Sequence, residues 1–125
     1  MKNRKWEAHL ENNGYTLNDV NKLMNEKIEY LKMKKNITEK DPLTPDKYKR
    51  EAGRFVTLIQ SNYPIKMFVL QEIDAEEVRI GYYIVSLKKL VKKGMLSLQW
   101  GQFNPNIPKD DLKKLLQLAQ ERGIL

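Results

Sequence analysis

Apolar residues recur at intervals of three and four near the amino end of the chain, the spacing that places side chains on one face of a helix. The residues on this face are Leu17, Val20, Met24, Ile28 and Leu31. Thr16 stands before them and Asp19 follows it by three positions, a pairing typical of a helix N-terminus because both side chains can accept backbone N–H groups. We therefore predict a helix from Thr16 to about residue 35, in an N-terminal helical segment of residues 1–36.

Two later stretches carry the same spacing. After a polar connection at residues 36–48, Thr44 suits the N-cap and Pro45 the first helical position. The apolar residues that follow are Tyr48, Ala52, Phe55, Val56 and Ile59. Because the residue before Pro64 is disfavoured in a helix, the predicted helix covers residues 44–61. A C-terminal helix is predicted over residues 108–122, with an apolar face of Leu112, Leu115, Leu116 and Ala119.

The middle of the chain supports two interpretations. As strands, "KMFVLQEI" and "VRIGYYIV" form a hairpin around "DAEE", with alternate residues from Val78 to Ile84 on one side. As a helix, residues 74–93 start at the N-cap Asp74 and gather an apolar face from Ile80 to Val91, with Gly94 just beyond the end. The helix is favoured, because the alternation stops at Leu87 whereas the helical face continues. "MLSLQW" then alternates as a strand.

Together these elements predict a single α+β domain of residues 1–125, mainly helical. It has four helices and a short β element near residues 95–103. Composition agrees with a soluble globular protein, since 41% of the residues are hydrophobic and 31% are charged. No apolar run approaches the roughly 20 residues of a membrane span, and the basic amino terminus lacks the apolar stretch of a signal peptide. A cytoplasmic location is the expectation.

The net charge is +7 and the sequence pI is about 9.5. Such a surplus favours polyanionic partners, nucleic acid among them, without bearing on the fold. The chain has no cysteine, which excludes disulfides, thiolate nucleophiles and cysteine-based zinc sites. His9 is the only histidine, and the acidic neighbours Glu76–Glu77 and Asp110–Asp111 point apart on a helix. No catalytic motif occurs, so we expect no enzyme, no cofactor and no bound metal.

The stretch "SLKKLVKKGMLSLQW" resembles the end of the recognition helix of winged-helix DNA-binding domains, running through a glycine into the first wing strand. The resemblance implies a winged-helix-like unit over residues 44–103. Its helices would be residues 44–61, 65–73 and 74–93, and the third would enter the major groove.

Two functional hypotheses follow. In the first, the protein is a small nucleic-acid-binding or regulatory protein that uses the basic face of the helix 74–93. The predicted contact residues are Arg79, Tyr82, Ser86, Lys89 and Lys93, supported by a second basic stripe of Lys47, Arg50 and Arg54. In the second, it is a non-enzymatic protein–protein adaptor or inhibitor, with a homodimer as one form. Its contact surface would be the apolar residues Val78, Val85, Trp100 and Phe103.

Overall fold

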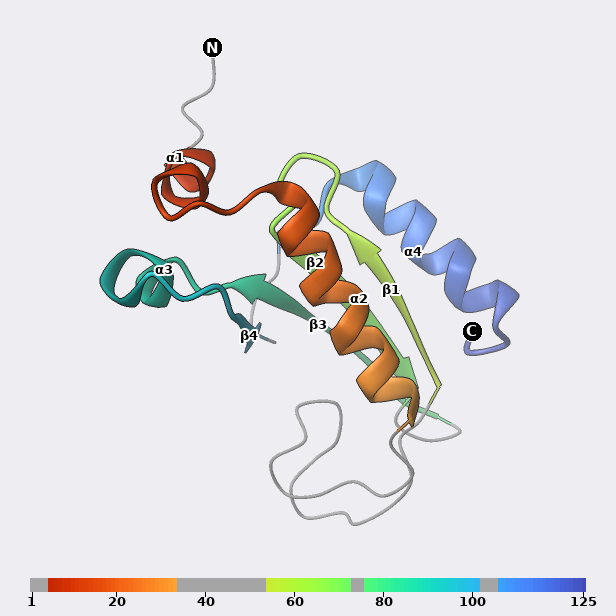
Figure 1. Cartoon of the computed structure of the whole chain (residues 1–125). Helices are drawn as coiled ribbons and strands as arrows, with labels where there is room; N and C mark the ends of the chain where they lie inside the picture. The colour runs from red at the N-terminus through yellow and green to blue at the C-terminus, as the bar shows by residue number, and fades with distance from the viewer. Residues whose placement is uncertain (1–4, 34–53, 73–75, 102–105) are drawn as a thin grey trace.

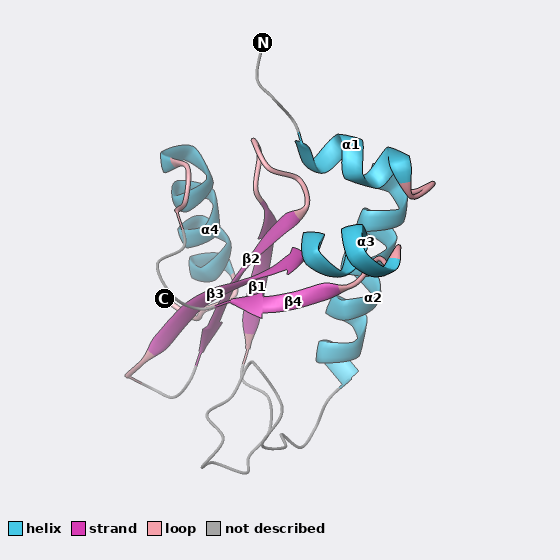
Figure 2. Cartoon of the chain, turned by 90° about the vertical axis from the view of Figure 1, so that its left-hand side faces the viewer, coloured by secondary structure: helices cyan, strands magenta, loops and turns pink. Residues whose placement is uncertain are grey.

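A computed structural model describes residues 5–33, 54–72, 76–101 and 106–125. These ranges form an α+β fold, as predicted, with four helices and a four-stranded antiparallel sheet in the order β1-β2-β3-β4. The elements are α1 (Lys5–Asn12), α2 (Leu17–Met33), β1 (Phe55–Ile59), β2 (Lys66–Glu72), β3 (Val78–Val85), α3 (Leu87–Lys93), β4 (Leu98–Gly101) and α4 (Lys109–Glu121). The sheet lies between α2 on one face and α4 on the other (Figures 1 and 2).

Each strand pairs with the next one along the chain. A short turn joins β1 to β2, where the Gln60 N–H donates to the Lys66 carbonyl at 2.9 Å. The longest ladder joins β2 to β3 over seven residue pairs, from Lys66 opposite Ile84 to Glu72 opposite Val78. β3 and β4 are also antiparallel neighbours, but the chain between them forms α3 instead of a tight turn.

One face of the sheet packs against α1, α2 and α3. Met67 and Val69 of β2, with Tyr83 and Val85 of β3, are the buried strand residues of this layer. The helices contribute Trp6, Leu10, Val20, Met24, Leu31 and Leu90. Fully burying a side chain of this size stabilises the fold by about 1.5–3 kcal/mol relative to its exposed state. This larger core therefore fixes all three helices to the sheet.

The opposite face packs against α4. Val56, Phe68 and Leu70 on the strands meet Leu115 and Ala119 on the helix, and Ile124 closes the cluster. Because consecutive strand residues point to opposite faces, β2 contributes to both layers. That explains why "KMFVLQE" is apolar almost throughout instead of alternating with polar residues.

The helices predicted near the two ends are confirmed. α2 carries the predicted apolar face, with Val20, Met24 and Leu31 buried, although Leu17 is exposed. The Thr16 N–H donates to the Asp19 carboxylate at 2.8 Å, the reciprocal contact that the capping pattern implies. α4 lies inside the predicted range of 108–122, and β4 lies inside 95–103.

The predicted helix over residues 74–93 is wrong. Residues 78–85 form β3 and Ser86 is the N-cap that follows it. Within the described part of the predicted range, only residues 87–93 are helical. The physical reason is that both sides of β3 are needed in the core, since Tyr83 and Val85 face one layer while Ile80 and Tyr82 contact the other. A helix would bury one side only. Pairing with β2 also satisfies the β3 backbone.

The predicted helix over residues 44–61 is also wrong where it can be compared. Residues 55–59 form β1, and residues 44–53 lie outside the described residues. The implied second helix of a winged-helix unit, residues 65–73, contains β2. The prediction of a mainly helical fold is not confirmed, because the described helices pack around a four-stranded sheet.

Candidate functional site

The structure separates the residues predicted to share one basic face. Arg79 and Tyr82 lie on β3 an odd number of residues apart, so they point to opposite faces of the sheet. The Arg79 Nε donates to the Gln71 Oε1 at 3.2 Å, and its guanidinium lies 5.7 Å from the centre of a Trp100 ring. Arg79 is therefore already engaged within the protein.

Tyr82 also has a structural role. Its phenol ring lies against Gly101, the residue opposite it on β4, and the Lys66 Nζ stands 4.5 Å from its ring centre. The same ammonium is 5.1 Å from the ring of Phe68. Partial burial lowers the pKa of Lys66 below the ordinary value for lysine. The two rings offset part of that desolvation by a cation–π interaction.

Ser86 is 5% exposed and caps α3. Its Oγ accepts the Lys89 N–H at 3.3 Å, which satisfies one of the free donors at the helix start. This position leaves little of Ser86 exposed to a ligand. A nucleic-acid contact at Ser86 stays a prediction, whereas its role in capping the helix that carries the lysines is seen directly.

Arg54 ties the sheet to the end of α4. Its Nη2 lies 2.7 Å from the Glu72 carboxylate and donates to the Gly123 carbonyl, while its Nη1 donates to the Arg122 carbonyl at 2.9 Å. The hydrogen bond and the charge of Glu72 raise the pKa of Arg54. Arg54 thus makes four hydrogen bonds to three residues of the protein, namely Glu72, Arg122 and Gly123. The other members of the predicted stripe, Lys47 and Arg50, lie outside the described residues.

The residues of the alternative apolar patch do not form one surface. Val85 is 2% exposed and belongs to the core, whereas Val78 is 39% exposed at the far end of the same strand. Trp100 is partly buried, with its ring 5.0 Å from that of Tyr83 and its edge against Gly81. Phe103 lies outside the described residues. Of the four residues, Val78 and Trp100 are the two that the described part of the chain leaves at least partly exposed, and a partner contact there stays a prediction.

What remains of the predicted basic face is α3, with the sequence LKKLVKK. Leu90 is fully buried and Leu87 partly buried, so these two residues mark the inner side of the helix. With an advance of about 100° per residue from Leu87, the lysines spread from about 100° to about 240°, opposite that side. The exposed side chains in this arc are Lys88, Lys89, Lys92 and Lys93.

Lys88 and Lys92 were not among the predicted contacts. Leu87 and Leu90 mark the inner side of both the predicted and the observed helix, and all four lysines are exposed in the helix that forms. The signal that would have found them is Ser86, a good N-cap residue three positions before Lys89.

The charge on α3 has no internal compensation. The helix contains no acidic residue, and no described residue forms an ion pair with any of its four lysines. Val91 and Met95, which are 56% and 50% exposed, lie beside them. Other charged helices are mixed: α4 carries Asp110 and Asp111 in its first turn among its lysines. Of the described elements, α3 is the most strongly positive.

Contacts at both ends hold α3 in place. Gly94, with φ of 63°, ends the helix and donates its N–H to the Leu90 carbonyl at 2.9 Å. The left-handed conformation there favours glycine. The Gly94 carbonyl in turn accepts the Tyr15 hydroxyl at 3.1 Å, which links α3 to the connection between α1 and α2. The four lysines therefore project from a fixed backbone.

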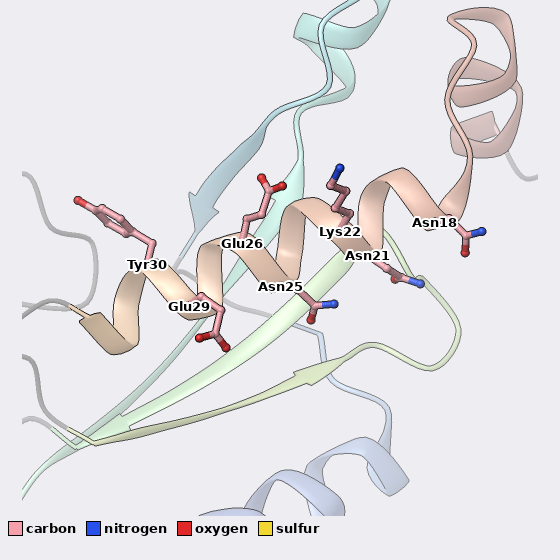
Figure 3. A pocket seen from close by; sticks show the side chains of 7 residues that line it. All are labelled: Asn18, Asn21, Lys22, Asn25, Glu26, Glu29 and Tyr30. Atoms are coloured by element: carbon pink, nitrogen blue, oxygen red, sulfur yellow. The ribbon is translucent and has the colours of Figure 1, made fainter.

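A shallow depression of about 710 Å³ follows the outer face of α2. Figure 3 shows Asn21, Asn25 and Glu29 on one side of the helix and Lys22 and Glu26 on the other, so the polar groups do not converge. Within the described ranges, no group of three or more His, Asp or Glu side chains gathers as a metal site. The α2 surface thus lacks the geometry of an active site.

No protein-family model matches the chain, and neither a curated protein nor a solved structure does. Among the described helices, none is both long and apolar enough to cross a membrane. Function is therefore inferred from the residues and their geometry.

Proposed function

We propose that the protein binds nucleic acid through phosphate contacts made by the four lysines of α3. The observation that carries the proposal is the exposure of Lys88, Lys89, Lys92 and Lys93 on one side of a fixed helix that contains no carboxylate of its own. Lysine ammonium groups bind phosphate as point charges, and each neutralised phosphate releases condensed counterions. The net charge of +7 adds a favourable long-range field.

The chemistry of α3 predicts binding that does not depend on base sequence. Specific reading of base edges commonly uses Arg, Asn or Gln, and the exposed polar side chains of α3 are all lysine. Phosphate contacts position a protein on nucleic acid without reading its sequence. We therefore expect similar affinity for unrelated sequences of equal length.

An anionic membrane is a weaker match to the same surface. Helices that lie in a membrane interface need a continuous apolar face directed at the lipid. The apolar side of α3, Leu87 and Leu90, instead packs into the core of the protein. Only Val91 and Met95 remain to contact lipid, so a phosphate backbone in water suits α3 better.

The test compares two variants of equal net charge. The first changes all four α3 lysines to glutamine. The control changes four exposed lysines on α2 and α4: Lys22, Lys109, Lys113 and Lys114. Fluorescence anisotropy measures affinity for a labelled 20-base-pair duplex and a 20-nucleotide single strand between 50 and 200 mM salt.

If each α3 lysine meets one phosphate, the slope of log K against log salt on the duplex falls by about 3.6 in the first variant. Between 50 and 200 mM salt, the affinity of the wild type should therefore fall by roughly 10²-fold more than the affinity of this variant. The control should retain most of the wild-type slope. Equal losses in both variants, or no binding by the wild type at 50 mM salt, would overturn the proposal.

A further inference from the structure

We infer that the outer edge of β1 binds an extended segment of another protein, which adds to the sheet as a fifth strand between α2 and α4. This site lies apart from the α3 lysines and does not depend on the proposed nucleic-acid binding. β1 is at one end of the strand order, so it pairs only with β2 among the described residues.

The hydrogen-bond pattern identifies the backbone groups at this edge. The Arg54 carbonyl accepts the Glu72 N–H at 2.8 Å, and the Gln60 N–H donates to the Lys66 carbonyl at 2.9 Å. Because antiparallel pairs alternate, the even-numbered residues between them direct their backbone groups toward β2. The groups of Phe55, Thr57 and Ile59 point outward, and no described residue pairs with them.

A groove of about 390 Å³ follows this edge. Its floor includes Phe55 and Thr57, one wall is formed by Ile28 and Lys32 of α2, and the other by Leu118 with Arg122 at the end of α4. Figure 1 shows α4 on the side of β1 away from β2, so the helix extends past the edge and forms a wall there. An extended peptide can add a strand to an exposed sheet edge, where main-chain hydrogen bonds supply affinity and pockets for alternate side chains supply specificity.

A second copy of this chain does not fit the same edge. Sheets joined through two β1 strands would place those strands about 4.8 Å apart. Each α4 packs on its own β1 and extends beyond it. In an antiparallel pairing both α4 helices would lie on one face of the joined sheet and would occupy the same space, because packed helices need about 8–10 Å between their axes. A single strand without a helix attached to its flank avoids this collision.

The walls also define the chemistry of the partner segment. Glu29 and Lys32 form an ion pair on one wall, with 3.4 Å between Nζ and Oε1. Glu121 and Arg122 supply one charge of each sign on the other. The groove therefore has no net charge and favours an uncharged segment. Side chains of that segment would alternate between Ile28 on one wall and Leu118 on the other, so apolar or β-branched residues suit both positions.

The experiment uses blocked seven-residue peptides in which Thr alternates with Val, Ile, Leu or Phe. Each peptide is titrated into the ¹⁵N-labelled protein, and amide resonances are followed by NMR. We expect at least one to bind with Kd below about 1 mM, with the largest shifts at Phe55, Thr57 and Ile59. Methylating two consecutive central amides of that peptide blocks both of its edges and should weaken binding at least tenfold.

A change at the edge itself supplies the matched protein variants. Thr57→Pro removes the central outward N–H, a position where an edge strand tolerates proline, whereas Thr57→Val keeps that donor. Thermal unfolding shows whether each variant is folded. Binding lost in Thr57→Pro and retained in Thr57→Val supports strand addition. No saturable binding by any peptide, or equal binding by the methylated peptide, overturns it. The four-glutamine variant of α3 should still bind the peptide.

Discussion

The ring of Trp100 on β4 packs against Gly81 on β3, across the strand pair, on the face of the sheet that carries α2. A methyl group at Gly81 would lie 2.5 Å from two carbons of this ring and 2.9 Å from the Gly101 carbonyl oxygen. The opposite face repeats the arrangement with the partners exchanged, because Tyr82 of β3 lies against Gly101 of β4. Each strand thus supplies one aromatic ring and one glycine, and the two contacts fix how β3 and β4 lie together.

We predict that Gly81→Ala destabilises the protein by about 1–3 kcal/mol, the usual cost of overpacking a well-packed contact. The ring and a backbone carbonyl would both have to move. Urea unfolding measures the change. In a double-mutant cycle, Gly81→Ala should be less destabilising when Trp100 is already leucine, since the smaller side chain leaves space for the methyl group. If the two changes are simply additive, the ring is not the cause.

Ser86→Ala should cost about 1 kcal/mol through the loss of the α3 N-cap. Nucleic-acid binding should keep its salt dependence, because Ser86 is buried and contacts Lys89 through the backbone only. Urea unfolding of the variant measures the change in stability, and a salt titration of the same preparation measures the salt dependence of nucleic-acid binding. A reduced salt slope with unchanged stability would instead assign Ser86 a direct ligand contact.

The dependence of stability on alkaline pH should combine two opposite contributions. Burial lowers the pKa of Lys66 below its ordinary 10.5, so the unfolded state binds more protons near that pH and stability rises as pH increases toward 10.5. Burial raises the pKa of Tyr63 above its ordinary 10.0, so the folded state retains its proton longer and stability falls as pH rises above 10.0.

Denaturant unfolding between pH 8 and 11 tests this pair of contributions. Tyr63→Phe should remove the fall and expose the rise due to Lys66, and Lys66→Gln in that background should remove the rise. Both groups are largely solvated, so each effect should be small. An unchanged pH profile in Tyr63→Phe would contradict the assignment of the fall to this hydroxyl.

Hydrogen exchange should distinguish the two sides of β1. The amides of Val56 and Leu58 face β2 and should exchange roughly 10²-fold or more slowly than those of Phe55, Thr57 and Ile59, which face outward. NMR exchange rates in the free protein measure this ratio. Equal protection of all five amides would show that the edge is already occupied, and it would remove the basis for strand addition.

The sequence predicted the elements whose signals are local. α2 has both a capping pattern and a long apolar face, α4 has an opening proline and leucines at helical spacing, and β4 has simple alternation. α1 was not predicted, because Trp6 and Leu10 supply only one helical interval. Their burial depends on contacts with distant residues, including the edge contact of Trp6 with Tyr63 at 6.3 Å between ring centres.

β3 shows why a correct periodicity can indicate the wrong element. Ile80, Ile84 and Leu87 fit one helical face, yet Ile80 and Ile84 are equally compatible with one side of a strand. The helix was favoured because the alternation stops at Leu87, but the strand itself ends at Val85, and Tyr83 packs in the cluster on the face opposite that of Ile80. No local signal shows that both faces of a strand will be covered. Only the packing of α2 and α4 decides it.

Only part of the candidate site could be predicted, because distant residues place several of its side chains. Lys89 and Lys93 are exposed as expected, because lysines beside a buried leucine face solvent in the long and the short helix alike. Arg79 and Tyr82 are placed by cross-strand neighbours, and Ser86 by the end of β3. None of those three environments follows from spacing along the chain.

The placement of α3 between β3 and β4 has one more consequence. Val85 and Leu98 are cross-strand partners, and the Ser86 N–H donates to the Ser97 carbonyl at 2.9 Å, so the segment between them leaves and rejoins the sheet at adjacent points. Antiparallel neighbours need only a two-residue turn. Within the twelve residues from 86 to 97, Ser86 and Leu90 are buried, so the exposed lysines are the positions whose charge can change while the strands keep their register.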